Sequence, residues 1–289
     1  MCSDLIAVSP RSEVSSTIKL YKYISFEALK GLIEYGDFRV TYRKDCNDPL
    51  EMLPAGKLPG CGDLREERGF ISLTQCANNL TMWGNYADKF QGARIGFEFP
   101  YYCGERLSAG NKEEKHIHES LKQISELGLD IRFFQAFSKN GEIEPSGISR
   151  LLIKCIYVID NERVHYPPAS ESIEKTRIDA ERFWWSIMCT KAWDWRHEEE
   201  YRIPLEHTRD ITRSNKVKKS LMKFSNIPTP YIKSIILGPK CQLSQENVED
   251  LIAIKRSQMS CGTEYLPKDV LVAQARYNKT SFKLHIPEK

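Results

Sequence analysis

The chain has 289 residues, 41% of them hydrophobic, which is enough to bury a full core as one large domain or two close-packed ones. Its 42 lysines and arginines against 39 aspartates and glutamates give a formal net charge of +3, too balanced to indicate nucleic-acid binding by itself. Aromatic residues make up 10% of the chain, a content that argues against disorder.

The cysteines and the N-terminal residues indicate a reducing compartment. None of the nine cysteines forms a CxxC pair and their number is odd, so we expect small buried hydrophobes rather than a disulfide framework or a zinc site. Residues 1–16 show no basic start followed by an apolar run, and no apolar stretch is long enough to cross a bilayer. We therefore expect a cytoplasmic protein without a membrane partner.

The first third of the chain alternates between predicted strands and helices. A strand rich in β-branched and aromatic residues is predicted over 18–24, and a helix follows over 25–36, with Ser25 as its N-cap and Gly36 as its stop. The segment NDPLE, 47–51, has the form of a capped helix start. Three further strands and one helix are predicted, the strands at 38–44, 69–75 and 92–99 and the helix at 78–90.

The middle of the chain is predicted to be more helical, and strands return at the end. One or two helices are predicted over 119–137, a buried strand over 149–159 and the longest amphipathic helix over 172–190. The last predicted elements are a strand within 196–203, a strand at 231–239, a helix at 244–259 and a closing hairpin at 270–278 and 281–286.

This order of elements predicts an α+β fold with a mixed, largely antiparallel sheet or sheets. We expect residues 1–17 to form an N-terminal tail and residues 18–289 to form one domain. Within that domain a helical insertion, at about 104–190, separates an N-terminal from a C-terminal group of strands.

The segment RHEEEYRI, 196–203, places three consecutive glutamates in a predicted strand. Because successive side chains of a strand point to opposite faces, Glu198, Glu200 and Arg202 are expected on one face, and Glu199 and Tyr201 on the other. Two carboxylates on one face raise each other's pKa, which suits general acid–base chemistry or metal binding. The alternative is a solvated edge strand whose charge Arg202 and nearby lysines neutralise.

A second cluster of acceptors consists of Asn47, Asp48 and Glu51. It serves either as a helix cap or as a site for a ribose hydroxyl or a metal ion. The chain contains no GxGxxG, Walker, GxSxG or HExxH motif, so most familiar cofactor and hydrolase classes are unsupported.

Hydroxyl and aromatic side chains form a third group of candidates. Ser72 and Thr74 lie on one face of the strand predicted over 69–75. Trp83 and Tyr86, one helical turn apart, can stack on a planar ring, although aromatics at this spacing more commonly fill a core.

Four blocks carry a pattern of specific motifs that spans the chain from about Lys19 to His285. The blocks are YKYISFEALKGLIEYGDFRVTYRKDCNDPLE at 21–51, FISLTQCANNLTMWGNYADKFQGARIGFEF at 70–99, KAWDWRHEEEYRI at 191–203 and IKSIILGPKCQLSQENVEDLI at 232–252. They resemble a bacterial family, the domain-of-unknown-function 2971 family, with Leu50 where phenylalanine is more usual and Asn85 where histidine is expected. The resemblance implies a fold-level grouping and, loosely, a role in antiphage defence, without an established activity.

A more remote resemblance is to ADP-ribosyltransferases, which use three strand-borne elements in a fixed order. Here the first strand has neither Arg nor His, so Lys22 or Tyr23 takes that place; Ser72 and Thr74 follow, and then the glutamates. The resemblance implies that Glu200 is the catalytic carboxylate and Glu198 the orienting one, with NAD as the substrate. A carboxylate stabilises the oxocarbenium character that develops as the nicotinamide–ribose bond breaks.

The candidate residues divide into two sets. The catalytic candidates are Glu198, Glu200 and Arg202. The candidates for binding NAD are Tyr21, Tyr23, Asn47, Asp48, Ser72, Thr74, Trp83, Tyr86 and Lys191.

Two alternatives to an NAD-consuming toxin or defence enzyme stay open. In a metal-dependent nuclease or phosphodiester enzyme, Lys191 contacts a phosphate, and magnesium is held by Asp48, Glu51, Glu98, Glu198 and Glu200. In a non-enzymatic sensor or binding module, the same clusters are caps and ion pairs. Neither enzyme hypothesis specifies whether the acceptor is a nucleic acid or a protein.

Overall fold

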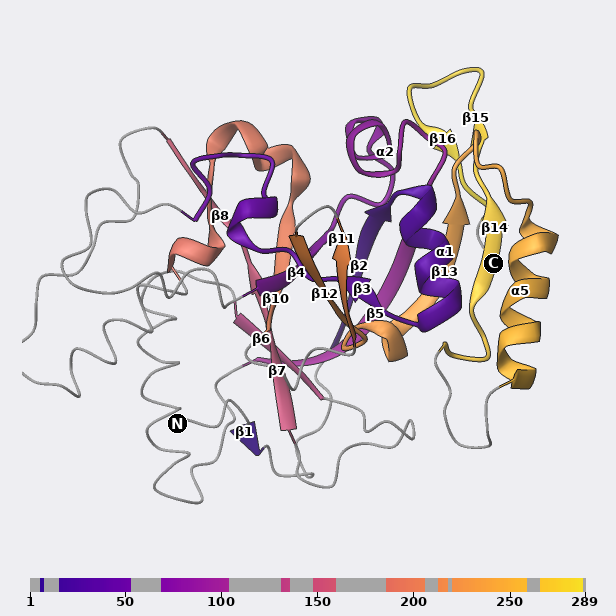
Figure 1. Ribbon diagram of the computed structural model, residues 1–289. Helices are drawn as coiled ribbons and strands as arrows, with labels where there is room; N and C mark the ends of the chain where they lie inside the picture. Colours follow the sequence, from indigo (N-terminus) through magenta and orange to yellow (C-terminus); the bar gives the residue numbers. More distant parts are fainter. Residues whose placement is uncertain are drawn as a thin grey trace, which may run out of the picture.

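The computed structural model describes residues 6–7, 16–52, 69–103, 131–135, 148–159, 186–205, 213–217, 220–258 and 266–287 (Figure 1). Within these residues the chain forms one large sheet whose strands pair antiparallel except for β13 and β14, which pair in parallel. The predicted α+β class with a mixed, largely antiparallel sheet is therefore confirmed. The strands of this sheet are β1 (Ile6–Ala7), β2 (Ser16–Ile24), β4 (Gly69–Thr74), β5 (Ala93–Cys103), β6 (Ile131–Gln135), β7 (Ile148–Lys154), β10 (Glu200–Leu205), β13 (Ile232–Leu237) and β14 (Leu271–Gln274).

Six of these strands pair in a closed circuit, in the order β7, β10, β4, β2, β5, β6 and back to β7. Most of the pairings are long: β2 pairs with β5 along its whole length, and β10 pairs with β4 along its whole length. By contrast, among the described residues β2 and β4 are joined by a single pair, Tyr21 opposite Thr74. We call this weakly paired junction of β2 and β4 the seam.

Two helices cover one side of the sheet, and local sequence explains their limits (Figure 1). Helix α1 (Phe26–Tyr35) begins where the Ser25 hydroxyl accepts a hydrogen bond from the amide of Ala28. It ends at Gly36, whose φ of 68° is the left-handed conformation that glycine adopts without strain. Helix α5 (Gln245–Gln258) begins after Ser244, whose hydroxyl accepts from the amide of Asn247.

These helices bury apolar faces against the sheet in one core. Helix α1 contributes Leu29, Leu32 and Ile33, and α5 contributes Val248 and Ile252. The strands contribute a larger set of fully buried side chains, including Leu20, Ile71, Ile95, Ile203 and Ile235. In the described parts of the chain, no helix is both long and apolar enough to cross a membrane.

The remaining described elements are short. They are β3 (Phe38–Arg39), β8 (Ile156–Val158), β9 (Thr190–Ala192), β11 (Arg213–Val217), β12 (Ser220–Ser225), β15 (Arg276–Tyr277), β16 (Leu284–His285), the helix α2 (Leu80–Tyr86), and the 3₁₀ turns η1 (Arg43–Asp45), η4 (Trp193–Glu198) and η6 (Thr229–Tyr231). The strand predicted over 38–44 forms only in part, since β3 ends at Arg39, Thr41 makes an isolated bridge with Phe70 and η1 follows at Arg43–Asp45. Residues 47–52 form a turn rather than a helix start.

The middle of the chain matches the strand predicted over 149–159, where β7 and β8 lie, but differs from the prediction at another segment. The predicted helix over 119–137 is wrong at 131–135, which is the strand β6. The segment IRFFQ is rich in β-branched and aromatic residues, and β5 and β7 offer it pairing partners on both sides. Most of the expected helical insertion, and nearly all of the helix predicted over 172–190, lies outside the described residues.

Candidate functional site

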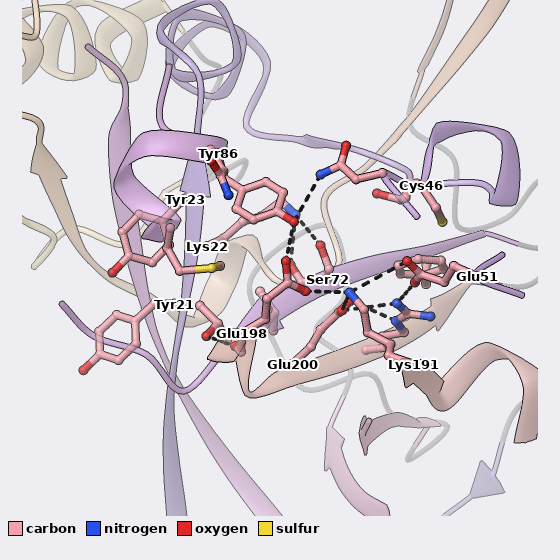
Figure 2. Close-up of a pocket in the computed structure, with 18 of the residues that line it drawn as sticks. Tyr21, Lys22, Tyr23, Cys46, Glu51, Ser72, Tyr86, Lys191, Glu198 and Glu200 are labelled. Atoms are coloured by element: carbon pink, nitrogen blue, oxygen red, sulfur yellow. Dashed lines mark hydrogen bonds and ion pairs between the residues drawn. The ribbon is translucent and has the colours of Figure 1, made fainter. Parts of the chain in front are cut away.

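A cavity of about 270 Å³ lies at the seam, with residues of both β2 and β4 in its wall (Figure 2). Because β2 and β4 pair only at Tyr21 and Thr74, the two strands separate beyond this position. Side chains from β10, α2, η4, β9 and the 41–51 segment enclose the space between them. Ten of the predicted site residues line this cavity: Tyr21, Tyr23, Asn47, Ser72, Thr74, Tyr86, Lys191, Glu198, Glu200 and Arg202. Asp48 and Trp83 do not line it.

The register between β10 and β4 brings the hydroxyls and two of the charged residues to one face. Glu200 lies opposite Thr74, and Arg202 lies opposite Ser72. Residues directly opposite each other in an antiparallel pair point to the same side of the sheet. The strand alternation expected for Glu200 and Arg202 therefore holds, and it places both beside the Ser72–Thr74 face.

Glu198 reaches the cavity by a different route from the one predicted. It is the last residue of η4, and strand β10 begins only at Glu200. Between them Glu199 has φ 43° and ψ 51°, a left-handed conformation that sends its side chain to solvent. The prediction of a continuous strand through three glutamates is wrong because this turn separates the like charges, while the carbonyl of Glu198 accepts from the Thr74 hydroxyl.

Five buried charged residues form an ion network at the floor of the cavity (Figure 2). The Lys191 ammonium lies 2.5 Å from Glu198 Oε2, 2.7 Å from Glu200 Oε2 and 3.7 Å from Glu51 Oε2. Arg202 donates from Nε to Glu200 Oε1 at 2.8 Å and from Nη2 to Glu200 Oε2 at 3.2 Å, and it also pairs with Glu51. We refer to Glu51, Lys191, Glu198, Glu200 and Arg202 as the buried ion network.

The buried ion network contains three carboxylates and two cations, so it holds one negative charge in excess. Each member is buried, with at most 6% of its surface exposed, and buried charges persist only when they are paired. Burial by itself raises the pKa of Glu200, but Arg202 and Lys191 lower it from 4.5 to about 2. Burial likewise lowers the pKa of Lys191, yet Glu200 raises it above its usual value, so both stay charged at neutral pH.

Tyr86 and Asn47 extend the network toward the mouth of the cavity. The Tyr86 hydroxyl donates to Glu198 Oε1, and Asn47 Nδ2 donates to the same hydroxyl at 3.1 Å. Burial and the adjacent Glu198 carboxylate raise the pKa of Tyr86 above its usual value, so it remains a donor. In this structure Tyr86 fixes a carboxylate, whereas Trp83 is fully buried and packs edge-on against Tyr23, with ring centroids 5.1 Å apart.

Lys22 of β2 lines the cavity opposite the network. Its ammonium donates to the backbone carbonyl of Ser72 at 2.9 Å and to the Ser72 hydroxyl at 3.3 Å, so it satisfies a carbonyl in a stretch of β4 that β2 does not pair. Burial lowers the pKa of Lys22 from 10.5 to about 8, and Glu200 opposes this shift. Lys22 takes part in none of the ion pairs of the buried ion network.

The 47–51 segment caps no helix, and Asp48 stabilises a turn instead. Asp48 Oδ1 accepts from the amide of Leu50 at 2.8 Å, a local turn-forming bond, and the Glu51 amide donates to the Asp48 carbonyl at 3.1 Å. The turn thereby delivers Glu51, 6% exposed, into the buried ion network. The sequence prediction treated Glu51 and Asp48 as one cluster of acceptors, but in the structure only Glu51 lines the cavity.

Several lining residues carry no sequence signal that singles them out. These are Thr41, Asp45, Cys46, Phe70, Leu73 and Met82, whereas Asn85, which also lines the cavity, is singled out only as a departure from the family pattern. Phe70 lies beneath Arg202, whose guanidinium stands 4.1 Å from the ring centre, and this contact stabilises the buried cation. An apolar residue in an apolar strand cannot be recognised as such a support before the register is known.

No family model, no curated protein and no solved structure matches the chain. Within the described residues, no group of three or more His, Cys, Asp or Glu side chains is arranged to hold a metal ion.

Proposed function

We propose that the chain is an ADP-ribosyltransferase-like enzyme that takes NAD as its substrate and cleaves the bond between nicotinamide and ribose. The observation that carries the proposal is that one cavity gathers three groups in the expected chain order. Lys22 and Tyr23 come from β2, Ser72 and Thr74 come from β4, and Glu198 and Glu200 come from η4 and β10. Residues far apart in sequence thus meet around one space.

The charge of the buried ion network, considered apart from the Lys22 ammonium in the cavity wall, suits this reaction. Breaking the nicotinamide–ribose bond leaves positive charge on the ribose in the transition state, and fixed negative charge in a water-poor site stabilises it. The buried ion network supplies one excess negative charge without a change of protonation at neutral pH, because Arg202 and Lys191 keep Glu200 ionised. Its members are fixed by one another and need no reorganisation.

The hydrogen-bonding pattern assigns different tasks to the two glutamates. Glu200 accepts three bonds from the two cations, one from Arg202 on Oε1 and two, from Lys191 and Arg202, on Oε2. Among the described residues Glu198 accepts only one bond on each oxygen, from Tyr86 and Lys191, so it keeps more capacity to accept a further hydrogen bond than Glu200 does. We therefore assign Glu198 to the ribose and Glu200 to holding the two cations, the reverse of the roles implied by the resemblance.

Lys22 accounts for a further part of the dinucleotide. The Lys22 ammonium, hydrogen-bonded to Ser72, is a cation in the wall that can donate to a pyrophosphate oxygen. Tyr21 and Tyr23 flank Lys22 in β2, but their rings are engaged elsewhere, since Arg94 lies over the Tyr21 ring and the buried Tyr23 ring packs edge-on against Trp83 (Figure 2). Lys22 thus occupies the position where the resemblance expects an Arg or His.

Two further parts of the proposal come from the motifs. The four blocks resemble those of the domain-of-unknown-function 2971 family, and on that resemblance we propose a cytoplasmic role as a toxin or in antiphage defence. Cleavage of NAD depletes a cofactor that an infected cell and its phage both need, which is consistent with such a role.

A metal-dependent nuclease fits the cavity less well. Asp48 and Glu98, two of the expected magnesium ligands, do not line it. The oxygens of Glu51 and Glu200 are already engaged by Arg202 and Lys191, which occupy the positions that a divalent ion would need. A binding module is the second candidate, because the full pairing of Glu200 is also what a rigid, non-catalytic site requires.

The test is incubation of the purified protein with NAD. We expect NAD to raise the melting temperature and nicotinamide to appear with time by chromatography. A melting shift without nicotinamide favours the binding module. If NAD produces neither a shift in melting temperature nor any nicotinamide, then NAD is not the ligand.

A further inference from the structure

The C-terminal hairpin of the described chain carries a second candidate binding surface, which is independent of the proposed reaction. Strand β15 pairs with β16, Arg276 opposite His285 and Tyr277 opposite Leu284, and residues 278–283 connect them. The Phe282 ring is 95% exposed and the Tyr277 ring 56% exposed. Phe282 therefore contributes almost nothing to the core.

The root of this hairpin is fixed to the body of the protein. Leu284 is buried in a cluster that includes Tyr23 and Trp83. The Asn78 side chain holds the same residue from both sides, donating to the Leu284 carbonyl at 2.7 Å and accepting from its amide at 3.3 Å. The hairpin thus stands beside α2 at one end of the fold (Figure 1), with its connecting loop directed outward.

The charge of the hairpin is of one sign. Residues 276–285, RYNKTSFKLH, contain three cations and no acid, and all three cations are exposed: Arg276, Lys279 and Lys283. A neighbouring aromatic and cation continue the surface, because the Phe90 ring lies 6.5 Å from Tyr277 and the Lys240 ammonium lies 5.9 Å from Phe90. The adjacent turn adds Lys89 and one acid, Asp88.

This combination favours one class of partner. An apolar protein partner requires a contiguous apolar patch, whereas here the exposed ring stands among cations and the hydroxyls of Thr280 and Ser281. Cations that track a phosphate backbone, together with aromatic rings on which bases stack, are the features by which proteins bind single-stranded nucleic acid. Stacking on a projecting ring needs unpaired bases, which a duplex does not offer.

We propose that residues 276–285 bind single-stranded nucleic acid, with Phe282 and Tyr277 stacking on bases and Arg276, Lys279 and Lys283 contacting phosphates. The proposal concerns an interaction surface and does not depend on NAD cleavage. The surface for a nucleic-acid partner is thereby assigned to the hairpin of β15 and β16.

The test is fluorescence anisotropy with a labelled oligodeoxythymidine of about 20 nucleotides, longer than the ~4–16 nucleotides that one such surface covers. NAD is absent, so the result does not depend on the proposed reaction. We expect Phe282→Ala to weaken binding roughly five- to 150-fold, the loss measured for one stacked base. Tyr35→Ala, which removes a 51% exposed ring from α1, is the matched control and should bind as the wild type does.

A salt titration tests the phosphate contacts separately. Lys279→Ala and Lys283→Ala should each reduce the slope of log affinity against log salt by about 0.7, the value for one lost contact to a single strand. Lys44→Ala, an exposed lysine elsewhere, should leave the slope unchanged.

Three outcomes would overturn the proposal. The first is the absence of binding to the oligonucleotide at low salt. The second is binding that both Phe282→Ala and the lysine variants leave intact. The third is sedimentation with phosphatidylserine–phosphatidylcholine vesicles that Phe282→Ala abolishes, together with no oligonucleotide binding, which would make the hairpin a membrane-contacting element.

Discussion

Lys191 links the carboxylates of the cavity more directly than any other described residue. Its ammonium contacts Glu198 and Glu200 and lies within 3.7 Å of Glu51. A buried ion network of this kind adds little to stability compared with an apolar core, but the removal of one partner leaves buried charge uncompensated. Stability measurements on single variants therefore reveal whether the network exists as described.

The first prediction concerns that residue. Lys191→Met should lower the free energy of unfolding by about 3–5 kcal/mol, because two buried carboxylates lose their shared cation. Chemical denaturation of both proteins provides the measurement. Lys44→Met, at an exposed position, is the control and should change stability by less than about 0.5 kcal/mol. An unchanged midpoint for Lys191→Met would contradict the network.

A second prediction follows from the pKa of Lys22, about 8 in the folded protein. If its ammonium holds the pyrophosphate, affinity for NAD should be full below pH 8 and should fall as the pH rises through 8, because the neutral amine has lost its charge. Calorimetric titration from pH 6.5 to pH 9.5 measures this. In Lys22→Met the affinity should be weaker and flat over the same range; an equal decline in the variant would assign the dependence to another group.

At the scale of elements, close packing around the ends of β2 and β5 sets a further test. A Cβ added at Gly92 would collide with the backbone carbonyl of Ile24, which cannot move without disturbing the β2–β5 pairing. In helix α2, by contrast, a Cβ at Gly84 would meet no atom within 4 Å. The two glycines therefore respond to the same substitution in opposite directions.

We predict that Gly92→Ala destabilises the protein by about 1–3 kcal/mol through overpacking. Gly84→Ala should stabilise it by about 0.5–1 kcal/mol, because alanine is the better helix former. Thermal unfolding of the two variants compares them directly. A tolerated alanine at Gly92 would mean that β2 and β5 do not approach each other there as described.

Elements with local signals could be predicted from the sequence, whereas elements set by tertiary contacts could not. Ser25 and Gly36 determine the ends of α1 by their own hydrogen bond and backbone conformation, so the sequence is sufficient. The left-handed turn at Glu199 is different, because it depends on contacts with β4 such as the bond from the Gln75 amide to the Glu199 carbonyl. The strand β6 likewise depends on partners distant in sequence.

In the candidate site, too, some features could be predicted from local sequence and others depend on tertiary contacts. Strand alternation is enough to group Glu200 with Arg202, and the turn-forming Asp48 is recognisable from its neighbours. Alternation also puts Lys22 on the face opposite Tyr21 and Tyr23, yet all three line the cavity. At the seam the edge of β2 is open, so both faces of the strand reach the same space, and that opening is a property of the sheet rather than of any local pattern.

At the scale of the whole molecule, the cavity lies where the large sheet is most weakly paired, at the seam between β2 and β4. The circuit of paired strands holds β2, β4 and β10 in place, while the single pair at Tyr21 and Thr74 leaves room for a ligand between them. The hairpin of β15 and β16 is anchored through Leu284 to the cluster that contains Tyr23, a residue of the cavity wall. The proposed nucleotide site and the proposed nucleic-acid surface therefore both adjoin α2.

The most direct measurement is the rate of nicotinamide release from NAD by the wild type, Glu198→Gln and Glu199→Gln. These neighbouring glutamates differ in burial, since Glu198 faces the cavity and Glu199 faces solvent. Glu198→Gln should lower kcat by about 10²–10³-fold, the usual cost of removing one electrostatic stabiliser of the transition state, and should still bind NAD. Glu199→Gln should match the wild type. Equal rates for all three proteins would contradict a catalytic role for Glu198 and the cleavage of NAD at this cavity.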